Sequence, residues 1–266
     1  MNRLTTHPAG RAQGWLAVPP RRRAVPAVRL ICLPYAGGGS SAYTGWQELL
    51  GADVEVCPVE LPGRQSRWRD PAYTQVGPLV EVLASALAGE LDVPYALFGH
   101  SMGALVAFEL VRELRRRGAP PPRILFAAGG LAPGLRRTSP NIHDQPDAIV
   151  VDRLRKLGGI DEEILAEPEL LELLLPAIRA DFSVCETYEY APEPPLTCPI
   201  VAFAGDRDED VPPERVAPWR EHTSAGFALH VLPGGHFFPM TSRGALLRTV
   251  RAVLAVGGSM AAGCPL

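Results

Sequence analysis

Six short apolar runs along the chain predict buried strands. Between the first four runs, apolar positions recur with helical spacing over residues 76–91 and 102–117. Strands that alternate with amphipathic helices are typical of a parallel sheet with helices on both faces. The pattern therefore predicts a single α/β domain over residues 27–255. The predicted strands are residues 28–33, 54–61, 94–98, 124–130, 200–204 and 228–232.

The alternation breaks between about residues 131 and 195, where no strand pattern is found. Pro168 suits the first turn of a helix, whereas Pro176 should kink or interrupt that helix. The leucines of this segment exceed what one buried face needs, so we expect a helical lid over an active site rather than extra core packing. The predicted helices of this insertion are residues 147–157, 161–165 and 168–188.

The two ends of the chain lack this periodicity. Residues 1–26 are rich in Arg, Pro and small residues, which predicts a mobile tail, and residues 256–266 are expected to fray. The run Arg21-Arg22-Arg23 would suit an acidic partner, but a solvated tail is the plainer expectation. A closing helix is predicted over residues 246–254.

The amino-acid composition and net charge indicate which classes of protein this chain can belong to. The 266 residues are 47% hydrophobic and 21% charged, which suits a globular domain with a sizeable core, and the net charge of −3 gives no general attraction to nucleic acid. The chain has neither an apolar signal core near its N-terminus nor an apolar run of membrane-spanning length. We therefore expect a cytoplasmic enzyme that binds neither nucleic acid nor membrane. Its five cysteines lack C-x-x-C spacing, and the first four, which lie in or beside apolar runs, are expected to be reduced core residues. The five are Cys32, Cys57, Cys185, Cys198 and Cys264.

One turn carries the candidate nucleophile. The run Phe98-Gly99-His100-Ser101-Met102-Gly103 lies between a predicted strand and a predicted helix, which is the context in which G-x-S-x-G forms a nucleophile elbow. Such a turn would hold Ser101 in strained backbone geometry and aim the N–H of Met102 at a developing oxyanion. On this motif alone, a chance match at an ordinary turn is the alternative.

The loop after the first strand is the expected source of a second oxyanion donor. It contains Ala36 followed by Gly37-Gly38-Gly39, and consecutive glycines let backbone N–H groups turn toward an anion. A phosphate-binding loop is disfavoured because no Gly-Lys-Ser/Thr follows. A plain flexible turn remains the other interpretation.

A base and an acid are expected from later loops. His236 follows two glycines after the last predicted strand, where it can reach over the sheet edge to Ser101. Asp206, Asp208 and Asp210 all follow the fifth predicted strand, and the residues alone do not decide which is the acid. The chain order Ser, Asp, His is that of α/β-hydrolases. A metal site in this cluster is disfavoured because the cluster holds no His.

The loop after the second strand carries Arg64, Arg67 and Arg69. In a parallel sheet, this loop leaves from the same edge as the elbow, so these side chains are candidates to line the approach to Ser101. Solvated or paired arginines are the plainer alternative.

With these motifs assembled, the chain resembles the type II thioesterases, the free-standing editing hydrolases that accompany polyketide and nonribosomal peptide synthases in antibiotic biosynthesis. The resemblance covers roughly residues 28–255. Tyr35 is a departure, since many members carry His there. The motifs in question are Leu-Pro-Tyr-Ala-Gly-Gly-Gly, Leu-Pro-Gly-Arg-Gln-Ser-Arg, Phe-Gly-His-Ser-Met-Gly, Leu-Leu-Pro-Ala-Ile-Arg-Ala-Asp-Phe, Gly-Asp-Arg-Asp and Gly-Gly-His-Phe-Phe.

The resemblance implies an α/β-hydrolase fold with Asp208 as the acid and the N–H groups of Ala36 and Met102 as the oxyanion hole. It implies hydrolysis of acyl thioesters from the phosphopantetheine arm of an acyl or peptidyl carrier protein, through an acyl-serine on Ser101, with no cofactor and no metal. Carrier proteins are typically acidic, so the three arginines of the 64–69 loop are candidates to guide docking.

Three other functions stay open from the sequence. A general carboxylesterase acting on small oxyesters would share the catalytic residues. A chain-terminating thioesterase of a synthase is disfavoured because the chain has its own Met1 and no carrier module. A non-catalytic binding protein of hydrolase fold would be expected to have lost a member of the triad.

Overall fold

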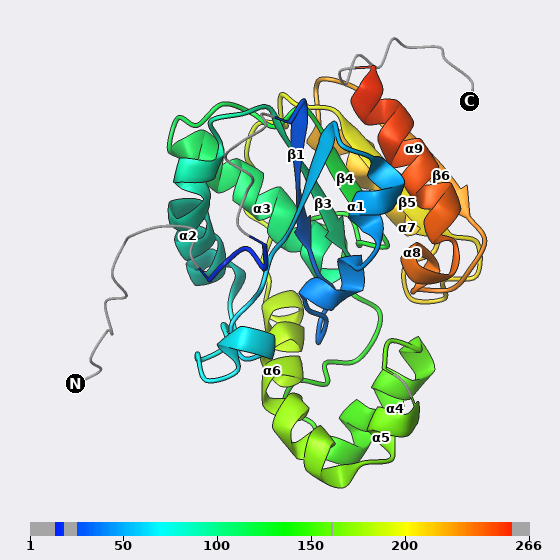
Figure 1. The fold of residues 1–266 in the computed structure, drawn as a ribbon. Helices are drawn as coiled ribbons and strands as arrows, with labels where there is room; N and C mark the ends of the chain where they lie inside the picture. Colours follow the sequence, from blue (N-terminus) through cyan, green and yellow to red (C-terminus); the bar gives the residue numbers. More distant parts are fainter. Residues whose placement is uncertain (1–13, 19–25, 161, 257–266) are drawn as a thin grey trace.

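The computed structural model describes residues 14–18, 26–160 and 162–256. Six strands form one sheet in the order β2-β1-β3-β4-β5-β6, and each neighbouring pair is parallel (Figure 1). All six predicted strands are present, so the predicted α/β fold is confirmed. The strands are β1 (Val28–Leu33), β2 (Val54–Pro58), β3 (Tyr95–His100), β4 (Leu125–Ala128), β5 (Ile200–Gly205) and β6 (Phe227–Leu232).

The predicted helices are also present, with shifts of a few residues at some ends. The sequence pattern missed α1 and α8, which have five and four residues, and so short a helix need not show a helical period. The helices are α1 (Trp46–Leu50), α2 (Val76–Leu87), α3 (Met102–Arg116), α4 (Asp147–Leu157), α5 (Glu162–Leu165), α6 (Pro168–Glu186), α7 (Pro213–Val216), α8 (Phe238–Thr241) and α9 (Arg243–Ala255). Short 3-10 helices span Ser40–Tyr43, Gln65–Arg67, Ala88–Glu90 and Ala217–His222.

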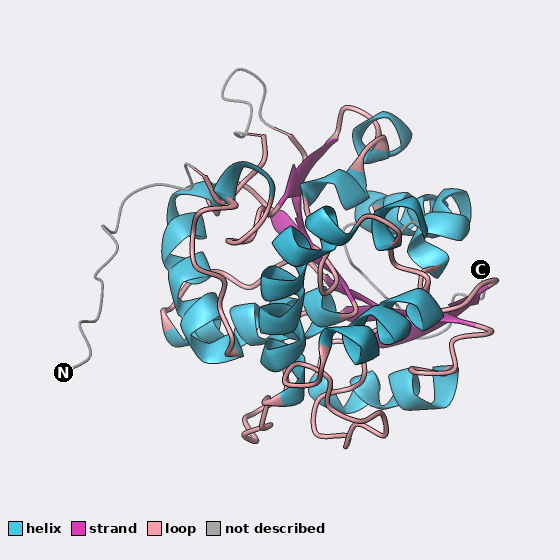
Figure 2. Cartoon of the chain, turned by 90° about the horizontal axis from the view of Figure 1, so that it is seen from below, coloured by secondary structure: helices cyan, strands magenta, loops and turns pink. Residues whose placement is uncertain are grey.

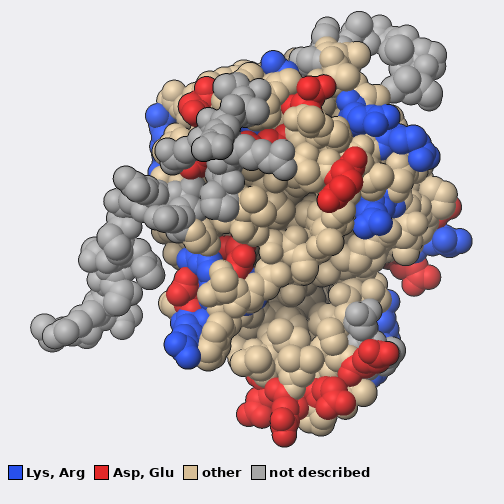
Figure 3. Space-filling view, in the orientation of Figure 1, with Lys and Arg blue, Asp and Glu red and all other residues tan. Residues whose placement is uncertain are grey.

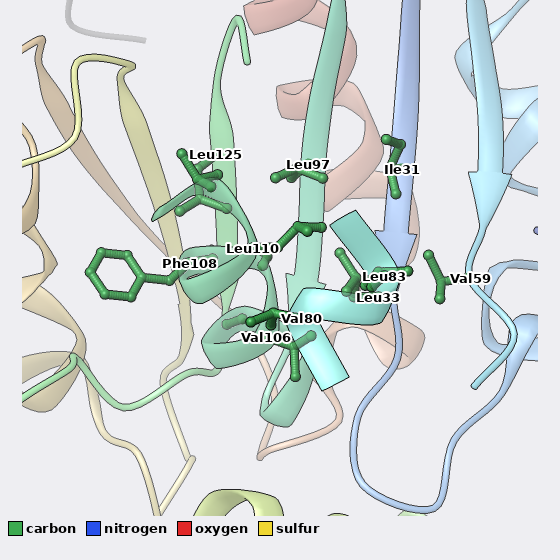
Figure 4. Close-up of a cluster of buried hydrophobic side chains, with 14 of the residues drawn as sticks. Ile31, Leu33, Val59, Val80, Leu83, Leu97, Val106, Phe108, Leu110 and Leu125 are labelled. Atoms are coloured by element: carbon green, nitrogen blue, oxygen red, sulfur yellow. The ribbon is translucent and has the colours of Figure 1, made fainter. Parts of the chain in front are cut away.

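Helices cover both faces of the sheet, as Figure 2 shows from below. On one face, α2 and α3 pack against the strands through a large apolar cluster, part of which is drawn in Figure 4. On the other face, α1 and α9 bury a second cluster that includes Trp46, Phe98 and Val250. β1, β3, β4 and β5 are buried along their whole length, as is typical of parallel strands with helices on both faces of the sheet.

The strand order creates a switch point between β1 and β3. The chain leaves β1 toward β2 on one side and later returns to β3 on the other side, with Leu33 opposite Gly99 in the register. Loops at the carboxyl ends of such neighbouring strands diverge and leave a crevice in which ligands bind. The glycine loop and the serine turn therefore lie side by side.

The insertion lies beyond the carboxyl ends of the strands, where α4, α5 and α6 form a separate layer (Figure 1). A third apolar cluster holds it together, with contributions from Ile142, from α4 and from α6. Helix α6 runs through Pro176 without a break, so the predicted interruption is wrong, while a kink there stays a prediction. Leu173 is 60% exposed, so not all of the leucines pack within the insertion, and its role as a lid stays a prediction.

Part of the expected tail packs on the domain instead. Trp15 and Leu16 are buried, and Leu16 forms an antiparallel bridge with Val59. The N–H of Ala17 donates to the carbonyl of Pro58 at 3.0 Å. Residues 14–18 therefore differ from the expected mobile tail, and β2 ends at Pro58 rather than at the predicted residue 61. The remaining predictions for residues 1–13, 19–25 and 257–266, including Arg21-Arg22-Arg23, lie outside the described residues.

The four described cysteines are free thiols. Cys32, Cys57 and Cys198 are buried, and burial raises the pKa of Cys57 and of Cys198 to about 12. These three are core residues, as predicted, whereas Cys185 is only partly buried and Cys264 lies outside the described residues.

Within the described part of the chain, each helix is too short or too polar to cross a membrane.

Candidate active site

The elbow turn brings Ser101 to the carboxyl end of β3. Ser101 has φ of 55° and ψ of −114°, a strained conformation for a residue with a side chain, and α3 begins at the next residue. A Cβ on Gly99 would lie 2.1 Å from the carbonyl oxygen of Gly103, and a Cβ on Gly103 would lie 2.1 Å from that of Leu33. Only glycine allows α3 to approach both strands this closely.

Ser101, His236 and Asp208 come together although they lie on three loops. The Nε2 of His236 is 2.8 Å from the Oγ of Ser101, and its Nδ1 is 2.8 Å from the Oδ2 of Asp208. Since an ionised carboxylate only accepts, the proton of the imidazole lies on Nδ1 and the hydroxyl of Ser101 donates to Nε2. This is the arrangement that lets an imidazole take the proton of a serine.

Burial and hydrogen bonds distinguish Asp208 from the other two aspartates. Its side chain is 1% exposed, and its Oδ1 accepts the N–H groups of Asp210 and Val211 at 3.0 Å each. Burial alone would raise the pKa of Asp208, but the hydrogen bond and charge of His236 and the two backbone donors hold it below its usual value. Asp206 accepts the N–H of Gly234 at 2.8 Å, and Asp210 pairs with Arg153 of α4.

His100 supports the loop that carries His236. Its Nε2 lies 2.9 Å from the carbonyl oxygen of His236, and since a carbonyl only accepts, Nε2 carries the proton. The ring is buried and packs edge-on against Tyr35 and Phe237. Burial, followed by the nearby imidazole of His236, lowers the pKa of His100 to about 3, so its side chain is neutral. This role of His100 was not predicted from the sequence.

Ala36 and Met102 each line a cavity that Ser101 also lines. Met102 is the first residue of α3, so its N–H has no acceptor within that helix. Ala36 lines a small cavity of about 50 Å³ together with Ser101 and His236. The glycine loop that follows Ala36 begins with a turn in which the N–H of Gly38 donates to the carbonyl of Tyr35 at 2.9 Å.

Two cavities meet at Ser101. The larger, about 790 Å³, runs from Ser101 between the loop after β4 and the segment that follows α6, and its walls include Leu131, Arg136 and Tyr188. The smaller, about 50 Å³, lies toward the insertion. Arg137 and Cys185 border both cavities. A substrate whose reacting carbonyl sits at Ser101 can therefore extend in two directions.

The three arginines of the loop after β2 have different surroundings. Arg64 is buried in an ion pair with Asp181 of α6, so the proposed role of Arg64 in docking a partner is wrong. Arg67 pairs with Asp70 at 2.9 Å and lies over the ring of Trp15. Arg69 is exposed and stacks on Trp68.

Within residues 14–18, 26–160 and 162–256, no three His, Cys, Asp or Glu side chains are grouped so as to hold a metal ion. What the geometry offers is a serine hydrogen-bonded to a histidine, which is in turn hydrogen-bonded to a buried aspartate, where two cavities meet.

Comparison with known proteins identifies relatives over most of the chain. The family model described as a thioesterase domain matches residues 28–254. The chain is 42% identical over 243 residues to the linear gramicidin dehydrogenase LgrE of Brevibacillus parabrevis, covering 90% of this chain and 92% of that protein.

Two solved structures are also similar. The RedJ thioesterase of the prodiginine pathway of Streptomyces coelicolor is 44% identical, with a TM-score of 0.79 over 85% of this chain and 86% of that one. The type II thioesterase BorB of the borrelidin biosynthetic cluster is 37% identical, with a TM-score of 0.81 over 90% of this chain and 97% of that one. The predicted resemblance and the hydrolase fold are confirmed.

The buried, neutral state of His100 predicts a pH-dependent part of the stability. Because its folded pKa lies below the ordinary 6.5, the unfolded chain takes up the proton first, so this stability is full above pH 6.5 and is lost as the pH falls toward 3. His100→Gln keeps an N–H donor for the carbonyl of His236 but does not titrate. Between pH 7 and pH 5, the wild type should lose about 2 kcal/mol more than His100→Gln in urea unfolding. Equal losses in the two proteins would contradict a neutral buried His100.

Proposed function

Since this chain belongs to the thioesterase family and is a thiolester hydrolase, we propose that it hydrolyses acyl thioesters on the phosphopantetheine arm of an acyl or peptidyl carrier protein. The observation that carries the proposal is the hydrogen-bonded chain from Ser101 through His236 to Asp208 at the meeting point of two cavities. Its role would be editing, the removal of aberrant acyl groups that block a polyketide or nonribosomal peptide synthase.

In the first half of the reaction, Ser101 becomes acylated. The Oγ of Ser101 attacks the thioester carbonyl carbon while its proton passes to Nε2 of His236. Asp208 holds the imidazole in the required tautomer and stabilises its positive charge. When the tetrahedral intermediate collapses, the C–S bond breaks and His236 returns the proton to the leaving sulfur, which gives the free thiol of the arm and an acyl ester on Ser101.

In the second half of the reaction, water hydrolyses the acyl ester on Ser101. His236 takes a proton from a water molecule that attacks the ester carbonyl, and the second tetrahedral intermediate releases a carboxylic acid and restores the hydroxyl of Ser101. Both intermediates carry a negative oxygen. We assign its stabilisation to the N–H groups of Ala36 and Met102, each of which would contribute about 3 kcal/mol. The reaction as written uses water alone and needs no cofactor.

The two cavities suggest which part of the substrate lies on each side of Ser101. The long, open cleft suits the extended arm, and the small cavity suits the acyl group. A volume of about 50 Å³ holds only a few atoms, because roughly 10–15 Å³ of such volume is needed for one water molecule. We therefore propose short acyl groups as substrates, with the insertion as the wall that limits their length.

Charge on the surface favours one side of the molecule for the carrier protein. Figure 3 shows acidic side chains gathered at the lower end of the insertion, where Glu163, Glu167, Glu169 and Glu172 are exposed. Like charges would repel an acidic partner there. The repulsion would be weaker at Arg69 or at the mouth of the cleft. A carrier protein would deliver its arm within the cytoplasm, the location that the sequence predicts.

The first test compares three acetyl donors and one serine variant. Wild-type protein should show a higher kcat/KM for an acetylated acyl carrier protein than for acetyl-CoA or an aryl acetate. Ser101→Ala should lower kcat about 10⁴-fold or more on all three, because it removes the nucleophile. Ser85→Ala, an exposed serine of α2, serves as the matched control and should retain activity.

Two outcomes would reject different parts of the proposal. Retained activity in Ser101→Ala would exclude the serine mechanism. A strong preference for the aryl acetate would favour a general carboxylesterase, the alternative that shares the same catalytic residues.

The second test identifies the acid. Asp208→Asn should lower kcat about 10⁴-fold, since the amide can donate to Nδ1 and thereby favour the wrong tautomer of His236. Glu209→Gln changes the neighbouring exposed carboxylate to an amide in the same way and should leave kcat unchanged. Steady-state hydrolysis of the same acetyl thioester measures both. If Asp208→Asn and Glu209→Gln were equally active, another residue would have to be the acid.

A further inference from the structure

A buried ion pair ties the insertion to the loops of the sheet. The guanidinium of Arg64 binds both carboxylate oxygens of Asp181, with NH1 to Oδ2 at 2.6 Å and NH2 to Oδ1 at 2.7 Å. The side chains are only 7% and 5% exposed. Arg64 follows β2, whereas Asp181 lies on α6, 117 residues later in the chain. The triad itself does not touch this pair.

The pair holds the glycine loop from two sides. The N–H of Gly37 donates to the Oδ2 of Asp181 at 2.7 Å, and NH1 of Arg64 donates to the carbonyl oxygen of Gly38 at 2.8 Å. Gly37 has φ of +80°, and a Cβ there would lie 3.0 Å from the side chain of Ile178 on α6. The loop therefore rests directly on α6 and is hydrogen-bonded to it.

We propose that Arg64 and Asp181 are positioning residues for the oxyanion hole. They fix the peptide that follows Ala36, and they thereby hold the N–H of Ala36 in the direction of the cavity at Ser101. The inference rests on the proposed serine mechanism and adds to it two residues that never touch the substrate.

Conformational freedom explains why such a device is needed. Gly37, Gly38 and Gly39 can adopt many backbone conformations, so the loop by itself does not fix the direction of a neighbouring N–H. A donor stabilises an oxyanion only when it is already aimed at the place where the charge develops. A buried ion pair adds little net stability compared with apolar side chains of similar size, so stability alone does not account for this one.

The pair also limits how the insertion moves. Asp181 lies in the half of α6 that follows Pro176, and its hydrogen bonds reach the loops after β1 and β2. If that half moved away, the glycine loop would lose the acceptor of Gly37. If the insertion opens while the oxyanion hole stays intact, only α4, α5 and the first half of α6 can move.

A matched pair of carboxylate-to-amide variants tests the proposal. Asp181→Asn removes the charge that orients Arg64 and the N–H of Gly37. Glu55→Gln makes the same change in a second buried ion pair, between Arg29 and Glu55, where Nε and Oε2 are 2.8 Å apart and the side chains are 5% and 8% exposed. That pair joins β1 to β2 away from the triad. Kinetics on an acetyl thioester and inhibition by an alkyl boronic acid, which forms a tetrahedral adduct with serine, are measured for both.

The expected result separates catalysis from structure. Asp181→Asn should lower kcat roughly 10- to 100-fold, the loss that misplacement of a group by about 1 Å causes, with KM nearly unchanged. Its affinity for the boronic acid should fall by a similar factor. Glu55→Gln should keep the kcat and the boronic acid affinity of the wild type, even if it unfolds at a lower urea concentration.

A double variant guards against a purely structural effect. Arg64→Met combined with Asp181→Leu replaces the pair by apolar side chains, which should restore much of the stability but not kcat. Recovery of kcat with stability, or equal kcat in Asp181→Asn and Glu55→Gln, would overturn the inference. If the wild type itself lacked Ser101-dependent hydrolysis, the proposed function would fail instead, and the two failures are thus distinguishable.

Discussion

The close approach of α3 to the ends of β1 and β3 is the constraint on which the site depends. Gly99 and Gly103 leave no room for a side chain, since a Cβ on either would lie 2.1 Å from a backbone oxygen. This contact forces the chain to turn at Ser101 in a strained conformation and to start a helix at Met102. Ser101 is thereby raised above the sheet edge at which the loops after β1, β5 and β6 also begin. The other groups need only short loops to reach it.

Elements with a local signal were predicted well. The strand Val28–Leu33 and the helix Asp147–Leu157 have the predicted ends, because hydrophobic periodicity and flanking turn residues mark both. The G-x-S-x-G turn and the histidine after the last strand carry their own turn chemistry. The sequence predicted that these residues would meet, because the carboxyl ends of parallel strands share one edge.

Features that depend on distant contacts had no such signal. The residues alone left Asp206, Asp208 and Asp210 open, and only the family resemblance named Asp208. Burial and the hydrogen bond to His236 now distinguish it, and neither is visible in a run of aspartates. The pairing of Trp15 and Leu16 with the end of β2 and that of Arg64 with Asp181 join segments far apart in the chain. Arginines in a loop suggested a docking surface, and only the fold shows that one of them is buried.

The central claim is that His236 activates Ser101 as the nucleophile of thioester hydrolysis. The most direct measurement is titration of the protein with a fluorophosphonate, which reacts irreversibly with an activated serine, followed by peptide mass spectrometry and by the assay of acetyl-thioester hydrolysis. We predict one phosphonyl group per chain, located on Ser101, with activity lost in proportion to labelling. Full activity after complete labelling of Ser101, or inactivation that follows modification of another residue such as Cys185, would contradict it.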